Sequence, residues 1–360
     1  MRARFGVAVG VLLGASVAAA VYFAGEPGMD GTADRGDPDG PEVRGVTLDA
    51  RARPSDEELN RLANLGATHL FVIPFGWQQS ADHPGVTLRT RNDRWYSEDD
   101  EGIRDLDRRA DSLGMAVVVK PHIWVRGDLP SGIDFGSKDD WVSWESDYRD
   151  LAMHYARLSA EINAPLFVIG TELAGPAVDR PAFWRQLVAD IRSVYSGRLT
   201  YAANWWEEYE HVSFWDALDY VGVQAYFPLE TVSTDSTRAE PTDFHRSWET
   251  HLTQLEQLSS RVGRPILFTE IGYRSIGYAA VEPWRWPERS ESARPRPDLQ
   301  ADLYTAFFDQ VWHHDWFSGA VVWKWRPGPV PDGRMSRDAL DFTIRDKPAE
   351  RIIADWYARP

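Results

Sequence analysis

The sequence predicts an α/β protein that folds as a single (β/α)8 TIM barrel. Eight short apolar segments alternate with helix-like segments from Val43 onward, and strands that alternate with helices form parallel sheets. A count of eight strands fits closure of such a sheet into a barrel. No glycine-rich phosphate loop follows the first strand, which disfavours the alternative, an open doubly wound sheet.

The predicted strands are short apolar runs bounded by turn residues, which is typical of parallel strands buried on both faces. In chain order they span 44–49, 69–74, 115–121, 166–171, 199–204, 220–226, 266–269 and 319–325. In the seventh, Pro265 follows a polar turn, four apolar or β-prone residues come next, and Glu270 follows the run. The fourth is followed in the same way by Glu172.

Helices are predicted between these strands from amphipathic periodicity and from start and stop residues. They span 54–66, 99–113, 141–162, 181–195, part of 207–217, 244–260, 298–313 and 348–357. Ser55 is a candidate N-cap, and Pro181 suits the first turn of its helix. The long segments that follow strand ends span 75–98, 123–140, 227–243, 272–297 and 326–347. Barrels place their substrate contacts in such βα loops.

The composition is that of a soluble globular protein with a large core. The 360 residues are 43% hydrophobic and 26% charged, and the formal net charge is −16. This acidity argues against nucleic acid or an anionic membrane surface as a partner. The chain has no cysteine, which excludes disulfides, a thiol nucleophile and a cysteine-ligated metal. We expect the protein to be a monomer.

The N-terminus resembles a targeting segment. Arg2 and Arg4 precede an apolar run that ends near Gly25, and the run contains small residues suited to cleavage. Residues 1–25 are therefore predicted to be a signal peptide or, because the run is also long enough to span a bilayer, a membrane anchor. Residues 26–42 are rich in Gly, Asp and Pro and are predicted to be a flexible linker. The catalytic domain is predicted to span 43–360, and the protein to be secreted, periplasmic or anchored facing outside.

Glu172 and Glu270 are the candidate catalytic residues. A charge after a buried strand has no packing reason to be there, and that end of a barrel strand faces the active site. Retaining glycoside hydrolysis needs a carboxylic acid and a carboxylate about 5–5.5 Å apart. The ends of strands four and seven of a small barrel can meet that spacing. Alternatively, each glutamate caps the following helix or pairs with an arginine.

Tryptophans are the candidate sugar platforms. The chain has 17 of them, and an indole ring matches the flat C–H face of a sugar. Trp323 ends the eighth strand, Trp205 follows the fifth, and Trp77 lies in the loop after the second. We expect all three to bind substrate. The alternative for each is packing in the core or in a loop.

Four further residues at strand ends are candidate substrate-binding residues. Tyr226 is expected to donate a hydrogen bond to the nucleophile and hold it ionised, or else only to line the site. His122 is expected to contact sugar hydroxyls or the acid/base, and Asn204 the substrate near the acid/base; structural roles are the alternatives. Lys120 is a candidate partner of a carboxylate in the barrel interior, or a structural residue.

Other chemistries have weak signals. His313 and His314 are adjacent on a predicted helix, so their side chains point in different directions and do not chelate one ion together. The zinc motif HExxH and the nucleophile elbow Gly-x-Ser-x-Gly are both missing from the sequence. We therefore expect no metal and no cofactor.

The strand-end motifs resemble those of clan A of the retaining glycoside hydrolases, and more narrowly glycoside hydrolase family 113. They are Lys120-Pro-His-Ile-Trp124, Phe167-Val-Ile-Gly-Thr-Glu-Leu173, Phe268-Thr-Glu-Ile-Gly-Tyr273 and Val322-Trp-Lys-Trp325. The resemblance implies a (β/α)8 barrel in which Glu172 is the acid/base and Glu270 the nucleophile. It also implies that Tyr226 hydrogen-bonds the nucleophile and that Trp323 is the strand-eight platform. Many clan members have Asn immediately before the acid/base, where this chain has Thr171.

That resemblance implies a β-glycan substrate, with β-1,4-mannan or manno-oligosaccharides expected first. Two alternatives stay open: a retaining hydrolase or transglycosidase of another β-glycan, and a barrel that binds glycans without cleaving them. Because mannose and glucose differ at the 2-hydroxyl, the departure at Thr171 leaves the contact that would distinguish them unassigned.

Overall fold

Eight parallel strands form the closed barrel that the sequence predicts. The computed structural model describes residues 42–89, 95–229, 241–287, 294–328 and 337–359. Around the barrel the strands follow the order β1-β11-β10-β9-β8-β7-β5-β2. Their bounds are β1 (Val43–Leu48), β2 (His69–Val72), β5 (Ala116–Val119), β7 (Leu166–Thr171), β8 (Arg198–Asn204), β9 (Val221–Gln224), β10 (Ile266–Ile271) and β11 (Phe317–Trp325). All eight correspond to predicted strands.

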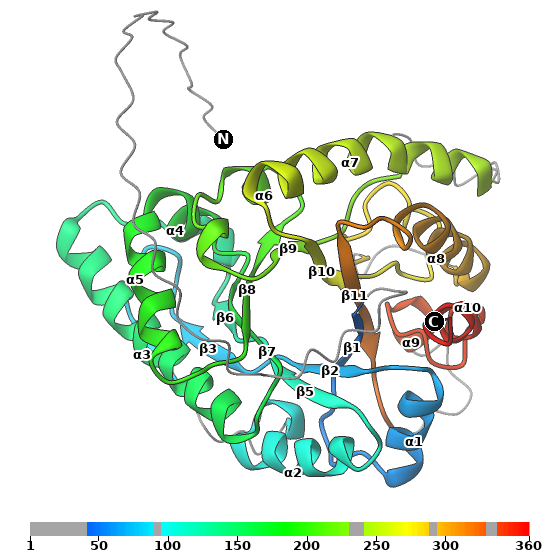
Figure 1. The fold of residues 1–360 in the computed structure, drawn as a ribbon, viewed down its shortest axis with the longest axis horizontal. Coiled ribbons are helices and arrows are strands. Elements are labelled where there is room, and N and C mark those ends of the chain that lie inside the picture. Colours follow the sequence, from blue (N-terminus) through cyan, green and yellow to red (C-terminus); the bar gives the residue numbers. More distant parts are fainter. Residues whose placement is uncertain (1–41, 90–94, 230–240, 288–293, 329–336, 360) are drawn as a thin grey trace, which may run out of the picture. The chain divides into compact units, whose positions relative to one another are not determined.

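Helices follow the strands along the chain and lie around the outside of the barrel (Figure 1). The longer ones are α1 (Asp56–Asn64), α2 (Asp100–Asp111), α3 (Lys138–Glu161), α5 (Pro181–Arg192), α7 (Pro241–Val262), α8 (Pro297–Val311) and α10 (Pro348–Tyr357). The predicted cap of α1 is confirmed, because the Ser55 hydroxyl accepts a hydrogen bond from the Glu58 amide at 3.2 Å. Pro181 is the first residue of α5, as predicted.

Several short elements decorate the βα loops. The short helices are α4 (Ala174–Asp179), α6 (Glu208–His211) and α9 (Arg337–Leu340), and the 3-10 helices are η1 (Tyr96–Glu98), η2 (Pro130–Gly132) and η3 (Trp215–Ala217). The helix expected within 207–217 is thus two pieces, α6 and η3. Helix α4, which begins two residues after Glu172, was not predicted from the sequence.

A second, three-stranded sheet is the main feature of the fold that was not predicted from the sequence. It has the order β4-β3-β6 and consists of β3 (Phe75–Gln78), β4 (Val86–Thr87) and β6 (His122–Val125). β3 and β6 follow the barrel strands β2 and β5 after short breaks at Pro74 and Pro121. A proline cannot donate to a strand ladder, so each segment leaves the barrel there and pairs again as a separate sheet.

Apolar side chains from different strands fill the interior of the barrel away from the carboxyl ends of the strands. They form one cluster: Val43, Phe71, Val118, Leu166, Val168, Ala202, Tyr220, Leu267 and Val321. A larger cluster packs the strands against the surrounding helices. The barrel is therefore a solid core rather than a pore, and the polar residues gather at the carboxyl ends of the strands.

The N-terminal predictions lie outside the part of the chain that the structure describes, apart from the last linker residue, Glu42. This applies to the signal peptide or anchor at 1–25 and to the linker at 26–41. Among the helices in the described ranges, none combines the length and the apolar character that crossing a bilayer requires.

Candidate active site

The candidate residues at the strand ends converge because all eight strands run in parallel. The carboxyl ends of parallel strands meet at one edge, which in a closed barrel becomes a single mouth. The residues that arrive there are Lys120, His122, Glu172, Asn204, Gln224, Tyr226, Glu270 and Trp323. The hydrogen bonds and ion pairs between them form two groups, one around each glutamate.

Glu270, on β10, is 4% exposed and is held by charge and hydrogen bonds. Lys120 Nζ pairs with Oε1, the Tyr226 hydroxyl donates to Oε2 at 2.6 Å, and His122 Nε2 lies 3.9 Å from Oε1. Burial raises the pKa of Glu270, but the charge of Lys120 and the hydrogen bonds from Lys120 and Tyr226 more than offset it, so the net pKa lies below the ordinary value. The carboxylate is therefore ionised at neutral pH.

Lys120 lies beneath Glu270 and has no exposed surface. Besides the carboxylate, its ammonium donates to Gln224 Oε1 at 2.9 Å and to the Thr269 carbonyl at 3.1 Å. All three ammonium protons are thus used inside the barrel. The structure places Lys120 as a partner of the carboxylate, and not on a surface that a glycan reaches.

Tyr226 follows β9 and fits the predicted hydrogen bond to Glu270. Burial and the neighbouring Glu270 charge raise its pKa well above the ordinary value, so the phenol keeps its proton and remains a donor. Its ring packs edge-on against Phe342 at 6.0 Å between centroids. This second contact fixes the direction in which the hydroxyl points.

Glu172 is the residue after β7, and its backbone has a φ of 52°. That left-handed conformation is uncommon for a residue other than glycine and is found where surrounding contacts hold it. Here the Glu172 amide donates to the Ala202 carbonyl at 2.9 Å, and Asn204 Nδ2 donates to Glu172 Oε1 at 2.9 Å. The carboxyl group is thereby fixed against β8.

The electrostatics of Glu172 are opposite to those of Glu270. Burial and the negative charges of Glu270 and Glu208 raise the pKa of Glu172 to about 8, and the opposing effects of Lys120 and Asn204 are smaller. Glu172 therefore carries a proton at neutral pH while Glu270 does not. Two carboxyl groups whose surroundings push their pKa values apart are suited to acid and base roles.

Trp323 lies near the end of β11, the strand that pairs with the Glu270 strand β10. Its ring centroid is 6.0 Å from Lys120 Nζ, and the side chain remains partly exposed. The peptide bond between Trp323 and Lys324 is cis. Gly272 allows β10 and β11 to approach here, because a Cβ at Gly272 would lie 2.7 Å from the Trp323 carbonyl oxygen.

Trp205 belongs to a surface formed by two βα loops. It stacks on Trp284 with centroids 4.9 Å apart and planes at 27°, and it meets Trp206 edge-on at 5.4 Å. Trp206 is 63% exposed and Trp284 41%. Exposed indole rings that are fixed by stacking on one another present the flat apolar surface that sugar rings contact.

Trp77 belongs to a separate aromatic group on the small sheet. It is paired in register with Trp124, and their ring centroids are 5.9 Å apart. Phe75 links Trp124 to His122, with ring centroid distances of 6.1 Å and 5.4 Å. Trp77 is thus connected to the glutamates through His122. Burial lowers the pKa of His122 to about 3, so its imidazole is neutral.

Glu208, on α6, is the functional candidate that sequence reasoning missed. It accepts hydrogen bonds from the Tyr201 hydroxyl at 2.5 Å and from the Asn204 amide at 2.7 Å. The segment holds Glu207, Glu208 and Glu210 close together, and only Glu208 is buried. The local sequence contains no signal that distinguishes the inward-facing glutamate from its neighbours.

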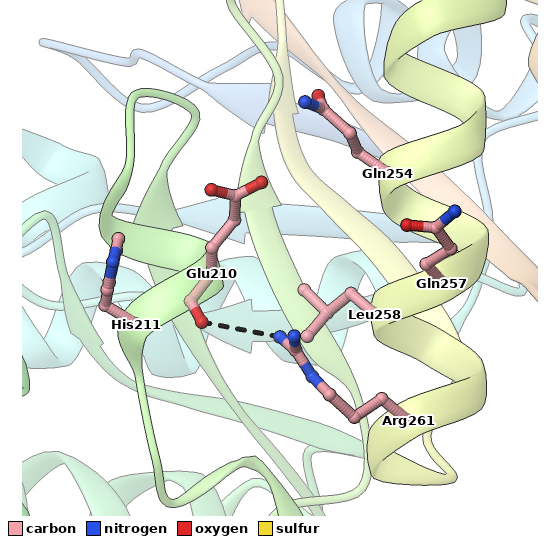
Figure 2. Close-up of a pocket in the computed structure, with 6 residues that line it drawn as sticks. All are labelled: Glu210, His211, Gln254, Gln257, Leu258 and Arg261. Carbon is pink, nitrogen blue, oxygen red and sulfur yellow. Dashed lines mark hydrogen bonds between the residues drawn. The ribbon is translucent and has the colours of Figure 1, made fainter. Parts of the chain in front are cut away.

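A pocket of about 420 Å³ lies outside this site, between α6 and the last turns of α7 (Figure 2). Its lining residues are Glu210, His211, Gln254, Gln257, Leu258 and Arg261. Figure 2 shows Arg261 donating to the Glu210 carbonyl, a contact of 3.4 Å. None of the candidate catalytic residues lines this pocket.

Across the described ranges, no cluster of three or more His, Cys, Asp or Glu side chains is arranged to hold a metal.

Comparison with known proteins agrees with this architecture. A solved structure described as a complex of a family 113 β-1,4-mannanase matches with a TM-score of 0.74 and 25% identity, over 89% of this chain and all of that one. A family 113 β-mannanase from Alicyclobacillus acidocaldarius matches with a TM-score of 0.75 and 23% identity, over 88% of this chain and 97% of the other. A β-glucuronidase from Ruminococcus gnavus shares the fold at 12% identity and a TM-score of 0.58, over 89% of this chain and 50% of that one.

A comparison with curated proteins found no match. The model of Glycoside Hydrolase Family 113 matches residues 44–347, which include every strand of the barrel except the first residue of β1. The chain therefore belongs to glycoside hydrolase family 113 and is a glycoside hydrolase that acts on O-glycosyl bonds.

Proposed function

We propose that the protein is a retaining β-glycoside hydrolase in which Glu270 is the nucleophile and Glu172 the acid/base. The observation that carries the proposal is the contrast between the surroundings of the two carboxyl groups. Lys120 and Tyr226 keep Glu270 ionised, whereas burial and two neighbouring carboxylates keep Glu172 protonated. A nucleophilic carboxylate and a carboxylic acid are the two forms that the first step of a retaining reaction requires.

In the first step, a Glu270 oxygen attacks the anomeric carbon while the Glu172 proton moves to the glycosidic oxygen. The bond to the leaving sugar breaks, and a covalent glycosyl ester remains on Glu270. In the second step, the ionised Glu172 removes a proton from water, and the water oxygen displaces the ester. Both residues return to their starting protonation states. Tyr226 and Lys120 stabilise the Glu270 carboxylate when it leaves.

A β-1,4-mannan or manno-oligosaccharide is the substrate we propose. The support is that two similar solved structures of the same family are described as β-mannanases. The 2-hydroxyl contact is not made by Thr171, because its hydroxyl is buried and donates to the Pro121 carbonyl at 3.2 Å. Asn204 is closer to the acid/base, through its bond to Glu172, and we assign the contact with the sugar to it.

The two exposed aromatic groups suit an extended glycan. Trp205 and Trp284 follow β8 and β10, whereas Trp77 and Trp124 belong to the loops after β2 and β5. The two aromatic groups therefore lie over different parts of the mouth. The glutamates come from the end of β7 and from β10. Trp323 supplies a platform beside the scissile bond. A chain of several sugar units would contact more than one of these groups.

The proposal is tested by two substitutions and a substrate screen. Both Glu172→Gln and Glu270→Gln should lose hydrolysis of mannan oligosaccharides, and a mechanism-based 2-fluoroglycoside should add one sugar mass to Glu270 of the wild type. Near-normal turnover in either variant would refute the assignment. A parallel screen with glucan, xylan and chitin oligosaccharides decides between mannan and another β-glycan, and measurement of product lengths reveals transglycosylation.

We also propose that the enzyme acts outside the cytoplasm as a monomer. The support for the location is the charged and apolar pattern of residues 1–25. Fractionation of cells that express the full chain tests it, and the mass of the product distinguishes a cleaved signal from a retained anchor. Light scattering of the soluble domain tests the monomer.

A further inference from the structure

A closed circuit of hydrogen bonds connects both sides of Glu172 to one buried carboxylate. Asn204 Nδ2 donates to Glu172 Oε1 at 2.9 Å, and the Asn204 amide donates to Glu208 Oε2 at 2.7 Å. On the other side, the amide of Leu173 donates to the Tyr201 hydroxyl at 2.7 Å. That hydroxyl donates in turn to Glu208 Oε1 at 2.5 Å. Glu208 thus connects the residue that bonds the Glu172 side chain with the backbone that follows Glu172.

The donors and acceptors in this circuit can be assigned in only one way that gives every hydrogen bond one donor and one acceptor. The two backbone amides can only donate, so the Tyr201 oxygen accepts from Leu173 and its own proton points to Glu208. Both Glu208 oxygens therefore accept. A proton on Glu208 would have to compete with one of these donors, and the circuit would open. The arrangement fits an ionised Glu208 carboxylate.

Among the described residues, no cation pairs with Glu208. Glu208 is 3% exposed, and no arginine, lysine or histidine in the described part of the chain forms an ion pair with it. A buried carboxylate without a cation is costly to maintain. Two donors point at the two Glu208 oxygens, and only an ionised carboxylate accepts on both; a glutamine would place an NH2 group against one of these donors.

We propose that Glu208 is a positioning residue for the proposed acid/base, with Tyr201 as its intermediary. Its carboxylate fixes Asn204 and the backbone after Glu172, so that the acid proton faces the glycosidic oxygen. Its negative charge also disfavours loss of that proton before the substrate binds. The inference rests on the proposed role of Glu172 and extends it, because it names what sets the orientation and protonation of the acid.

The charged groups that act on Glu172 are Glu270, Glu208 and Lys120. The pKa of Glu208 is raised by burial to about 7, and that of Glu172 lies at about 8. The pKa of Glu208 is the lower of the two, so Glu208 ionises before Glu172 as the pH rises. Removing this charge lowers the pKa of Glu172, so the loss of activity at high pH should begin at a lower pH.

The decisive variant is Glu208→Gln, which keeps the shape of the side chain, removes the charge and replaces one of the two acceptor oxygens by a donor. The high-pH limb of kcat/KM should move to lower pH by about 0.5 to 1 unit. kcat on mannan oligosaccharides should fall by about 10-fold to 100-fold with little change in KM, because the acid is misaligned. An aryl glycoside with a good leaving group should lose much less glycosylation rate, since its departure needs little protonation.

Two further variants separate the effect of the Glu208 charge from the effect of the hydrogen bonds that Glu208 accepts. Glu210→Gln removes a charge two residues away on the same helix, from an exposed side chain, and should leave the pH profile and kcat as in the wild type. Tyr201→Phe removes the link to the Leu173 amide but retains Glu208, so kcat should fall while the high-pH limb moves less than in Glu208→Gln. Tyr201→Phe also gives a test if Glu208→Gln does not fold, because the ring still packs on Trp184 and Phe214.

Glu172→Gln separates this inference from the proposed function. If Glu172 is the acid/base, its high-pH limb disappears in Glu172→Gln, and a limb that persists would refute that role. If the limb disappears there but Glu208→Gln has the wild-type limb and leaving-group dependence, the positioning role alone is overturned. An equal loss of kcat in Tyr201→Phe for mannan oligosaccharides and for the activated aryl glycoside would likewise overturn it.

Discussion

The hydroxyl of Tyr226 donates to Glu270 Oε2 at 2.6 Å, on the side of the carboxylate opposite to its contact with Lys120. The two oxygens of Glu270 therefore have different partners, a phenol on one and an ammonium on the other. Lys120 is fixed within the barrel by Gln224 and Thr269. Both partners favour the ionised carboxylate, and both must lose part of their interaction when the glycosyl ester forms.

Replacing Tyr226 by Phe should raise the pKa of Glu270, because a hydrogen bond to the charged form is lost. Activity at low pH depends on ionised Glu270, so the low-pH limb of kcat/KM should move to higher pH. We expect kcat to fall by about 10-fold to 100-fold, the range of one charge-assisted hydrogen bond of about 1.5–3 kcal/mol. A pH series with mannan oligosaccharides measures both effects.

Tyr273→Phe is the matched control for this variant. Tyr273 lies three residues after Glu270 and is fully buried, and its hydroxyl has no hydrogen-bond partner among the described residues. Removing that hydroxyl should leave the pH profile unchanged. If Tyr226→Phe behaves like Tyr273→Phe, then Tyr226 only lines the site, which is the alternative considered from the sequence.

Replacing Lys120 by Met should destabilise the fold in a pH-dependent way. The variant leaves a buried carboxylate without its cation, at an expected cost of about 3–5 kcal/mol at neutral pH. In the wild type the pKa of folded Glu270 is depressed, so its contribution is present above the unfolded pKa and is lost as pH falls through the folded pKa. In the variant the folded pKa is raised, so the deficit relative to the wild type should shrink as pH falls.

Urea unfolding of Lys120→Met at pH 7.5 and at pH 5 measures this difference. The double variant with Glu270→Gln removes both buried charges and should recover much of the lost stability at pH 7.5. An equal deficit at both pH values would show that Lys120 contributes packing by its aliphatic chain and not charge.

Truncating Trp284 should weaken binding of long substrates selectively. Trp284→Ala removes one face of the stacked pair with Trp205, and an aromatic contact of this kind contributes about 0.5–1.5 kcal/mol. KM for long manno-oligosaccharides should therefore rise by about 2-fold to 10-fold with kcat unchanged. A short aryl mannoside, which does not extend to this surface, serves as the control. Equal effects on both substrates would place Trp284 outside the binding cleft.

Sequence patterns predict the barrel well because each barrel strand is an uninterrupted apolar run. All eight runs became strands, and the residues at their carboxyl ends met at one mouth by geometry alone. The small sheet of β3, β4 and β6 was not predictable in this way. Its strands mix Trp77, Gln78 and His122 with glycine and alternate too briefly to show a period. Two of them, β3 and β6, begin directly after Pro74 and Pro121, where the chain leaves the barrel.

The candidate site was predictable where the chemistry is at a strand end, and not where it depends on contacts between loops. Glu172 directly follows β7 and Glu270 lies near the end of β10, so the strand pattern made both of them candidates for the mouth of the barrel. Glu208 is in a short helix among other glutamates, and only its bonds to Tyr201 and Asn204 distinguish it. The stacking of Trp205 on Trp284 was also not predictable, because Trp284 belongs to a loop that is distant in sequence.

Chemical rescue by azide should assign separate roles to the two glutamates. In Glu172→Ala the glycosyl ester can still form from an activated aryl glycoside, but no base helps water to break it. Azide needs no base and attacks the ester from the face opposite to Glu270, so the product should be the β-glycosyl azide. In Glu270→Ala the cavity left by the carboxylate admits azide from the other face, and direct displacement should yield the α-glycosyl azide. Proton NMR of the anomeric position distinguishes the two products, and wild-type enzyme, which should form neither in quantity, is the control. A β-azide from Glu270→Ala would mean that Glu270 is not the nucleophile, whereas an α-azide from Glu172→Ala would reverse the two assignments.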